Sequence, residues 1–276
     1  MKRTAMAALV FAVSLAWGTA MGAVPAEKTG KALAGAAAVT AEKAGTGQTA
    51  PKAAKAAAYG TSDKDGKVVS TDKYTPLSFY NKLWGYDLNN DYVLVMNDPS
   101  REYYKVYQIE YDRHTYDGHD WVYLNLPNEE VKPMLIASLK DSTAMYISCD
   151  VNKFLNRQKG VMDLKNFDYE SLLGVTMTMD KKERIITHAS ASSHAMTLIA
   201  VDINKATSKP TKWMVENSWG KENGFKGNYI MTDEWFNEYM FRFVLNKKYV
   251  PESAAKLLKQ KPIKLPAWDP MFAPEE

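Results

Sequence analysis

The stretch from residue 192 to residue 232 places one histidine and one asparagine on two successive strand-like runs, and this pairing most limits how the chain can fold. His194 opens an apolar run that is typical of a buried strand. A polar loop leads from it to a second strand, 213–216, which ends at Asn217. We expect two neighbouring antiparallel strands to hold these two side chains rigidly together.

A histidine that acts as a general base needs a third group on its far ring nitrogen, and an Asn side-chain carbonyl can fill that role. Asn217 is therefore the candidate that orients His194. Trp219 follows two residues later and can shield their hydrogen bond from water, which strengthens the bond in a low local dielectric. The Gly-rich turn 220–227 is assigned no catalytic function.

Several motifs along residues 74–276 occur in the order of one known family. They are Pro76-Leu77-Ser78-Phe79-Tyr80, Asn97-Asp98-Pro99, Cys149-Asp150-Val151, Ser193-His194-Ala195-Met196, Val215-Glu216-Asn217-Ser218-Trp219-Gly220, Met231-Thr232-Asp233-Glu234-Trp235-Phe236 and Leu265-Pro266-Ala267-Trp268-Asp269-Pro270-Met271.

In these motifs the chain resembles the C-terminal half of the aminopeptidase C and bleomycin hydrolase family, which are papain-like cysteine peptidases. The resemblance implies an α+β fold: an antiparallel β-barrel-like lobe with peripheral helices. It also implies that His194 and Asn217 are catalytic, that Trp219 supports them, and that the ligand is a peptide.

The resemblance implies a nucleophilic Cys in the N-terminal half, which this sequence does not supply. In papain the His and Asn lie roughly 130 to 150 residues after the Cys. Counting back from His194 and Asn217 reaches about residues 44 to 87, where no Cys occurs. We therefore expect no nucleophile in this chain and no activity from the chain alone.

Cys149 is the single cysteine, which excludes an internal disulfide and a Cys-based zinc site. It lies in an apolar strand, 143–151, where a buried structural thiol is favoured. Relatives in the resembled family also carry a Cys at the matching position besides their nucleophile. The alternative is that Cys149 is the nucleophile and pairs with His194.

Neither metals, cofactors nor nucleic acid are indicated. The His and Asp residues between Asp112 and Asp120 include His114 and His119, but their spacing is not diagnostic and a solvated loop is favoured over a metal site. The net charge of +3 comes from scattered Lys residues, which gives no electrostatic argument for nucleic acid.

Residues 1–23 are predicted to be a secretory signal, with Lys2 and Arg3 before an apolar core and small residues near Ala23. The alternative, an uncleaved membrane anchor, is disfavoured because the apolar run is short and Ala-rich. Residues 24–73 are predicted to form a disordered Ala/Lys-rich linker, because they lack large apolar side chains. The mature protein would be periplasmic or secreted, without a stable membrane anchor, whereas the resembled family is mostly cytoplasmic.

Ordered structure is expected from residue 74. Apolar alternation predicts strands over 91–96, 102–111 and 241–245. Helices are predicted over 129–139, capped by Asn128, over 233–239, capped by Thr232, and after Pro251. The tail, 262–276, is expected to be extended. In the resembled family this tail enters the active-site cleft and restricts cleavage to amino-terminal residues, but here residues 272–276 depart from the usual small-residue ending.

Two functions follow from these expectations. The first is the His/Asn half of a cysteine aminopeptidase, with a separate Cys-bearing partner chain supplying the thiol. The second is a secreted pseudopeptidase or gene remnant that binds peptides or homologous subunits. Because half of a two-lobed enzyme exposes the face that packs on the other lobe, self-association or a partner is expected in either case.

Overall fold

The computed structural model describes residues 57–58, 61–62, 68–70, 73–83, 87–113 and 115–272. The expected signal segment and most of the expected linker lie outside these residues. The chain divides into a smaller unit that ends at Asp87 and a larger unit whose described part begins at Leu88. The expected domain boundary, at residue 74, falls within the smaller unit.

The described residues of the smaller unit form two pairs of short antiparallel strands and one helix. Its elements are β1 (Ala57–Ala58) paired with β4 (Lys73–Tyr74), β2 (Thr61–Ser62) paired with β3 (Val68–Ser70), and α2 (Pro76–Leu83). Helix α2 begins at a proline, which suits the first helical position because proline lacks an N–H to satisfy. The side chain of Thr75 accepts a hydrogen bond from the Ser78 N–H at 3.1 Å and caps the helix.

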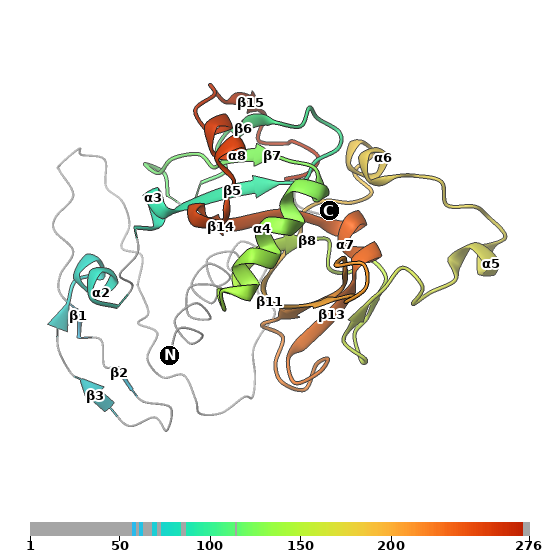
Figure 1. Ribbon diagram of the computed structural model, residues 1–276, viewed down its shortest axis with the longest axis horizontal. Helices are drawn as coiled ribbons and strands as arrows, with labels where there is room; N and C mark the ends of the chain where they lie inside the picture. Colours follow the sequence, from blue (N-terminus) through green and yellow to red (C-terminus); the bar gives the residue numbers. More distant parts are fainter. Residues whose placement is uncertain are drawn as a thin grey trace, which may run out of the picture. The chain divides into compact units, whose positions relative to one another are not determined.

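The larger unit is built on one sheet of eleven described strands (Figure 1), in the order β15-β6-β7-β5-β14-β8-β11-β12-β13-β10-β9. The strands are β5 (Tyr92–Met96), β6 (Lys105–Ile109), β7 (Val122–Asn125), β8 (Met145–Cys149), β9 (Leu155–Asn156), β10 (Val161–Met162), β11 (His194–Ile203), β12 (Pro210–Glu216), β13 (Asn228–Thr232), β14 (Met240–Asn246) and β15 (Ile263–Leu265).

The α+β class is confirmed, but the expected antiparallel barrel-like closure is wrong. Three neighbouring pairs run parallel: β15 with β6, β5 with β7, and β10 with β13. The order has two ends, β15 and β9, which are not joined within the described part of the chain. The sheet is therefore mixed and open. Short strands extend it at both edges: β9 and β10 at one, and β15 from the tail at the other.

Among the described residues of the larger unit, the helices are α3 (Leu88–Asp91), α4 (Asn128–Lys140), α5 (Tyr169–Leu173), α6 (Lys181–Ile186), α7 (Asp233–Tyr239), the 3-10 helix η1 (Lys247–Tyr249) and α8 (Glu252–Leu257). Helix α4 crosses the sheet over β11 and β14 (Figure 1). Capping of α7 by Thr232 is confirmed, since its side chain accepts from the Trp235 N–H. Capping of α4 by Asn128 is wrong: Pro127 holds that position, and the Asn128 side chain bonds instead to Asn237.

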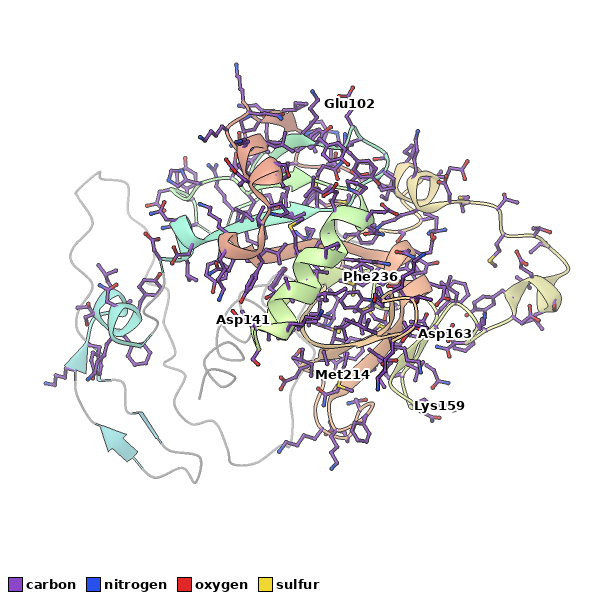
Figure 2. The ribbon with its side chains drawn as sticks, viewed as in Figure 1. Glu102, Asp141, Lys159, Asp163, Met214 and Phe236 are labelled. Carbon is purple, nitrogen blue, oxygen red and sulfur yellow. The ribbon has the colours of Figure 1, made fainter. Side chains whose placement is uncertain are left out.

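An aromatic stack under α4 fixes the strand that leads to the site. The rings of Trp213 and Phe236 lie 4.9 Å apart, and those of Phe236 and Phe243 lie 5.8 Å apart. Phe236 lies near the centre of the side chains in Figure 2. All three are buried, and aromatic side chains of this size dominate the energetics of a core. Strand β12, which contains Trp213, is therefore held firmly just before Asn217.

One segment of the larger unit, which we call the arm (residues 167–180), extends from the sheet with α5 near its tip (Figure 1). Every residue of the arm is exposed. The extended part after Gly174 alternates Val175, Met177 and Met179 with threonines, yet it pairs with no described strand. Such alternation is typical of a half-buried strand.

Candidate active site

His194 is the first residue of β11, an interior strand that pairs with β8 on one side and β12 on the other. The run that follows is anchored by Met196 and Leu198, both fully buried in the core. Thr197 pairs with Glu216, so the residue after β12 lies beside the start of β11. The sequence pattern of two successive strands thus brings Asn217 to His194.

The Nε2 atom of His194 lies 2.9 Å from Oδ1 of Asn217. The backbone N–H of Ser218 donates to the same Oδ1 at 2.8 Å, which identifies that atom as the amide oxygen. Because this oxygen can only accept, Nε2 must carry the proton of the neutral ring. Nδ1 is then the unprotonated nitrogen, available as a base.

Trp219 lies against the histidine, with ring centroids 4.9 Å apart and an angle of 39° between the planes. The rings of Trp219 and Tyr229 meet edge to face with their centroids 5.7 Å apart, and the Arg157 guanidinium lies 4.4 Å from the centroid of the Trp219 ring. Both neighbours hold the indole in place. Trp219 therefore lies beside the His194 ring, and its shielding role stays a prediction.

Burial lowers the pKa of His194 below its usual value. The hydrogen bond to Asn217 raises this pKa and partly offsets burial, whereas the charge of Arg157 lowers it further. The neutral imidazole therefore predominates at neutral pH. A neutral ring with a free Nδ1 is the form that accepts a proton from a nucleophile.

Cys149 lies directly opposite His194 on β8, but it is fully buried. Burial, followed by the charge of Asp150, raises the pKa of its thiol well above the usual value. No hydrogen bond joins its sulfur to the imidazole of His194 within the part of the chain that the structure describes. A thiol kept protonated in the core is a poor nucleophile.

A buried cation behind the site was missed by sequence reasoning. Arg242 of β14 donates through Nε to Ser192 Oγ at 2.7 Å. Ser192 Oγ lies 2.7 Å from Ser148 Oγ, and Ser148 Oγ donates to the carbonyl of His194 at 3.1 Å. Arg242 is 2% exposed and also lies over the ring of Phe272. In the sequence, an arginine between Phe241 and Phe243 in an apolar strand is the pattern that could have indicated this buried charge.

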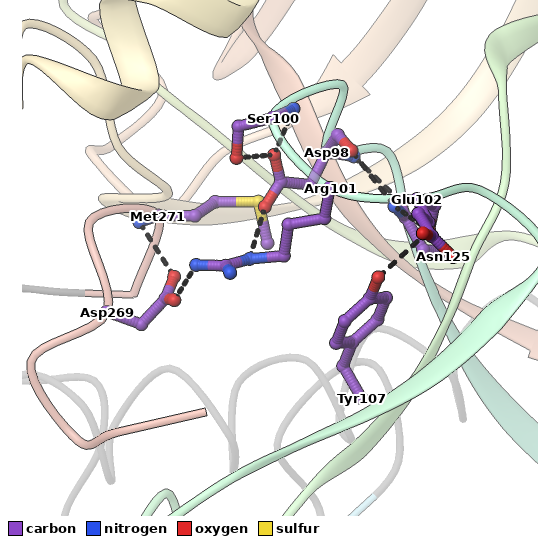
Figure 3. A network of polar contacts seen from close by, with 8 residues as sticks. All are labelled: Asp98, Ser100, Arg101, Glu102, Tyr107, Asn125, Asp269 and Met271. Carbon is purple, nitrogen blue, oxygen red and sulfur yellow. Dashed lines mark hydrogen bonds and ion pairs between the residues drawn. The ribbon is translucent and has the colours of Figure 1, made fainter. Parts of the chain in front are cut away.

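Polar contacts hold the tail against the turn that follows β5 (Figure 3). Arg101 pairs with Asp98 at 3.1 Å and with Asp269, and the Met271 N–H donates to Asp269. The carbonyl of Met271 in turn accepts from the Ser192 N–H at 2.9 Å. The tail thus reaches a point two residues before His194, and residues 273–276 lie outside the described chain.

Nothing among the described residues gathers three side chains able to hold a metal ion, and His114 of the His/Asp cluster is not described. None of the helices that the structure describes is long and apolar enough to cross a bilayer.

A histidine whose far nitrogen is fixed by an asparagine amide, beside a tryptophan and on an α+β scaffold, defines the class of papain-like cysteine peptidases. Residues 48–272 match the model of the Peptidase C1-like family, and the chain belongs to this family.

The relatives agree with this assignment. The chain is 41% identical over 216 residues to bleomycin hydrolase of Homo sapiens, covering 76% of this chain and 48% of that protein. It is 37% identical over 217 residues to aminopeptidase C of Lactobacillus delbrueckii subsp. lactis, covering 77% and 48%. The crystal structure of PepW from Lactobacillus rhamnosis HN001 matches with a TM-score of 0.72 and 33% identity, covering 78% of this chain and 49% of that one. The chain spans about half the length of these relatives.

Proposed function

We propose that this chain supplies the base and orienting half of a cysteine aminopeptidase site, acting on peptides at their amino-terminal residue. The observation that carries the proposal is the 2.9 Å contact between His194 Nε2 and Asn217 Oδ1, which leaves Nδ1 free. The names of the relatives bleomycin hydrolase and aminopeptidase C support the reaction class.

In the reaction, Nδ1 of His194 takes the thiol proton, and the thiolate adds to the peptide carbonyl carbon. The imidazolium then returns this proton to the leaving amine as the carbon–nitrogen bond breaks, which leaves a thioester. Water attacks the thioester with His194 again as base, and the thiol is restored with release of the acid. Asn217 Oδ1 stabilises the imidazolium in both steps.

The thiol has to come from residues outside this sequence. The chain has one cysteine, and Cys149 is buried with a raised thiol pKa. A Cys-bearing partner segment would present its sulfur to Nδ1 of His194, on the side of the ring away from Asn217.

The tail is proposed to limit cleavage to amino-terminal residues. The bond between Ser192 N–H and the Met271 carbonyl supports this role, because it holds the described part of the tail two residues before His194. Glu275 and Glu276 would then add negative charge where the ammonium group of a peptide binds.

The second candidate is a pseudopeptidase that binds peptides or homologous subunits without cleaving them. The arm favours it, since Leu172 and Leu173 are 77% and 61% exposed. A hollow of about 990 Å³ lies beside the arm, lined in part by Phe154, Phe167 and Tyr239. Neither His194 nor Asn217 lines this hollow, so it would receive a partner or a second copy rather than the scissile bond.

The deciding experiment measures release of a fluorophore from aminoacyl substrates under reducing conditions. The chain alone should be inactive, and Cys149→Ala should change nothing. Adding the separately expressed N-terminal half of PepW should restore turnover, and His194→Ala should abolish it. Asn217→Ala should reduce it by a factor of 10² or more, as expected for loss of acid–base function.

Two outcomes would overturn the proposal. Turnover by the chain alone that disappears in Cys149→Ala would make Cys149 the nucleophile. Peptide binding with no turnover, even with the added half, would favour the pseudopeptidase.

We also propose that the mature protein is periplasmic or secreted. The support is the charged and apolar segment at residues 1–23. Edman sequencing of the protein purified from its host should begin near Ala23, and a start at Met1 would contradict export by cleavage.

A further inference from the structure

The turn that carries Trp219 and a neighbouring turn form one continuous surface. The neighbouring turn joins β9 to β10 and includes residues 157–160, and the turn that carries Trp219 joins β12 to β13 through residues 217–227. The Ile230 N–H donates to the Gly160 carbonyl at 2.8 Å, and β10 runs parallel to β13. A Cβ atom on Gly160 would lie 2.6 Å from the Cα atom of Gly224, so the turns are in direct contact.

This surface is strongly cationic. Four exposed cations and one acid lie on the two turns: Arg157, Lys159, Lys221, Lys226 and Glu222. Lys159 points outward at the edge of the molecule (Figure 2). None of these five side chains forms an ion pair within residues 87–113 and 115–272. The charge is therefore available to a ligand.

Arg157 is the member of this group nearest the site. Its guanidinium lies 4.4 Å from the centroid of Trp219, and Trp219 lies 4.9 Å from His194. Contact with the indole restrains the guanidinium, and its parallel N–H groups match the two oxygens of a carboxylate. A lysine at this position would supply charge without that fork.

The chemistry of the site decides which part of a peptide passes Arg157. His194 delivers its proton to the leaving amine, so the residue after the cleaved bond must lie next to the imidazole. Trp219 covers that imidazole, and Arg157 lies on Trp219. An anionic group on the residue that follows the cleaved bond can therefore reach Arg157.

We propose that Arg157, held on Trp219 within the cationic surface of the two turns, is a carboxylate-binding residue for the part of the peptide that follows the cleaved bond. This inference rests on the proposed function, which sets the direction in which the peptide lies across the site. The preferred ligands carry a carboxylate on the second residue, either as the free end of a dipeptide or as an Asp or Glu side chain.

Binding tests the proposal without requiring turnover. The chain, labelled with ¹⁵N at its tryptophan indoles, is titrated with three probes: Leu-Gly, Leu-Gly-amide and Leu-Glu-amide. The Trp219 indole signal, assigned with Trp219→Phe, reports occupancy. Leu-Gly should bind about fivefold more tightly than Leu-Gly-amide, a ratio suited to a charge pair near the surface. Leu-Glu-amide shows whether a side-chain carboxylate serves as well as the free end.

Three variants distinguish recognition of the carboxylate from a general loss of peptide binding. Arg157→Gln should bring the ratio of acid to amide affinity close to one, and Arg157→Lys should keep an intermediate ratio. Lys205→Gln is the matched control, because Lys205 is exposed on the loop at the opposite end of β11 and β12. It should leave the ratio unchanged.

Equal affinity for acid and amide in the unaltered chain would overturn the proposal. So would a ratio that persists in Arg157→Gln, or the absence of any Trp219 response to the probes. Failure of the added PepW half to restore hydrolysis would count against the proposed function alone, because these ratios need no thiol.

Discussion

The guanidinium carbon of Arg242 lies 5.4 Å from the centroid of the Phe272 ring. This contact joins strand β14 to the last residue of the described tail. Tyr123 lies on the same ring at 5.2 Å and accepts a hydrogen bond from Arg242 at 3.3 Å. Arg242 therefore holds the tail and, through Ser192 and Ser148, the backbone of His194.

Replacing Arg242 with methionine should destabilise the fold and loosen the tail. Arg242 donates to Ser192, Tyr123 and, at 3.4 Å, Ser148 Oγ, and all three would lose their charged donor. Hydrogen bonds to charged groups contribute about 1.5 to 3 kcal/mol each. We expect a loss of about 2 to 4 kcal/mol in urea unfolding and faster proteolysis after Pro266. Arg113→Met is the control, because its contact with Asp120 is partly exposed, and it should cost less than about 1 kcal/mol.

Changes at Asn217 should shift the pKa of His194 in a defined direction. The amide oxygen favours the protonated ring, so Asn217→Ala should lower this pKa, whereas a carboxylate in Asn217→Asp should raise it. The measurement is an NMR titration of the His194 Cε1–H signal. An unchanged pKa in both variants would mean that the 2.9 Å contact does not persist in solution.

Lys181 should make the stability depend on pH above neutrality. Burial lowers the pKa of Lys181 to about 7, while in the unfolded chain it is about 10.4. Between these values the unfolded chain binds more protons, so the free energy of unfolding should rise with pH by up to about 1.4 kcal/mol per unit.

Urea unfolding at pH 7, 8 and 9 tests this, with the range kept below the tyrosine titrations. Lys181→Met should flatten the rise, and Lys182→Met, at an exposed neighbouring position, should not. Equal slopes for all three proteins would show that Lys181 does not titrate in this range.

Two glycines with similar backbone angles allow the contact between the turns to be isolated. Gly160 has φ of +66° and Gly174 has φ of +63°, so alanine carries the same left-handed strain of about 1 kcal/mol at each. A Cβ at Gly174 meets open space, whereas at Gly160 it collides with Gly224. Gly160→Ala should therefore cost at least about 1 kcal/mol more in thermal or urea unfolding, and equal costs would show that the turns separate easily.

The sequence predicted the histidine and asparagine pair because both residues follow from local patterns. An apolar run with His194 at its start, a short loop, and a strand ending at Asn217 define a hairpin whose geometry is nearly fixed. The same kind of pattern predicted α7, because Thr232 precedes two acidic residues in the first helical turn.

The parts that the sequence did not predict depend on distant segments. The sheet is open and mixed because β15, from the tail, pairs in parallel with β6, and no local pattern specifies that partner. Arg242 joins segments around residues 123, 148, 192 and 272, which no window of sequence shows together. Asn128 failed as a cap because Asn237, more than a hundred residues away, binds its side chain.

Because Cys149 is buried opposite His194, the reactivity of its thiol reports local opening of the sheet. A thiol reagent can modify Cys149 only when β8 separates from its neighbours, and the chain has no second thiol to compete. The labelling rate under native conditions, divided by the rate for an unfolded peptide, gives the equilibrium constant for that opening. Fluctuations of the strand pair that carries His194 can therefore be followed without a substrate or any mutation.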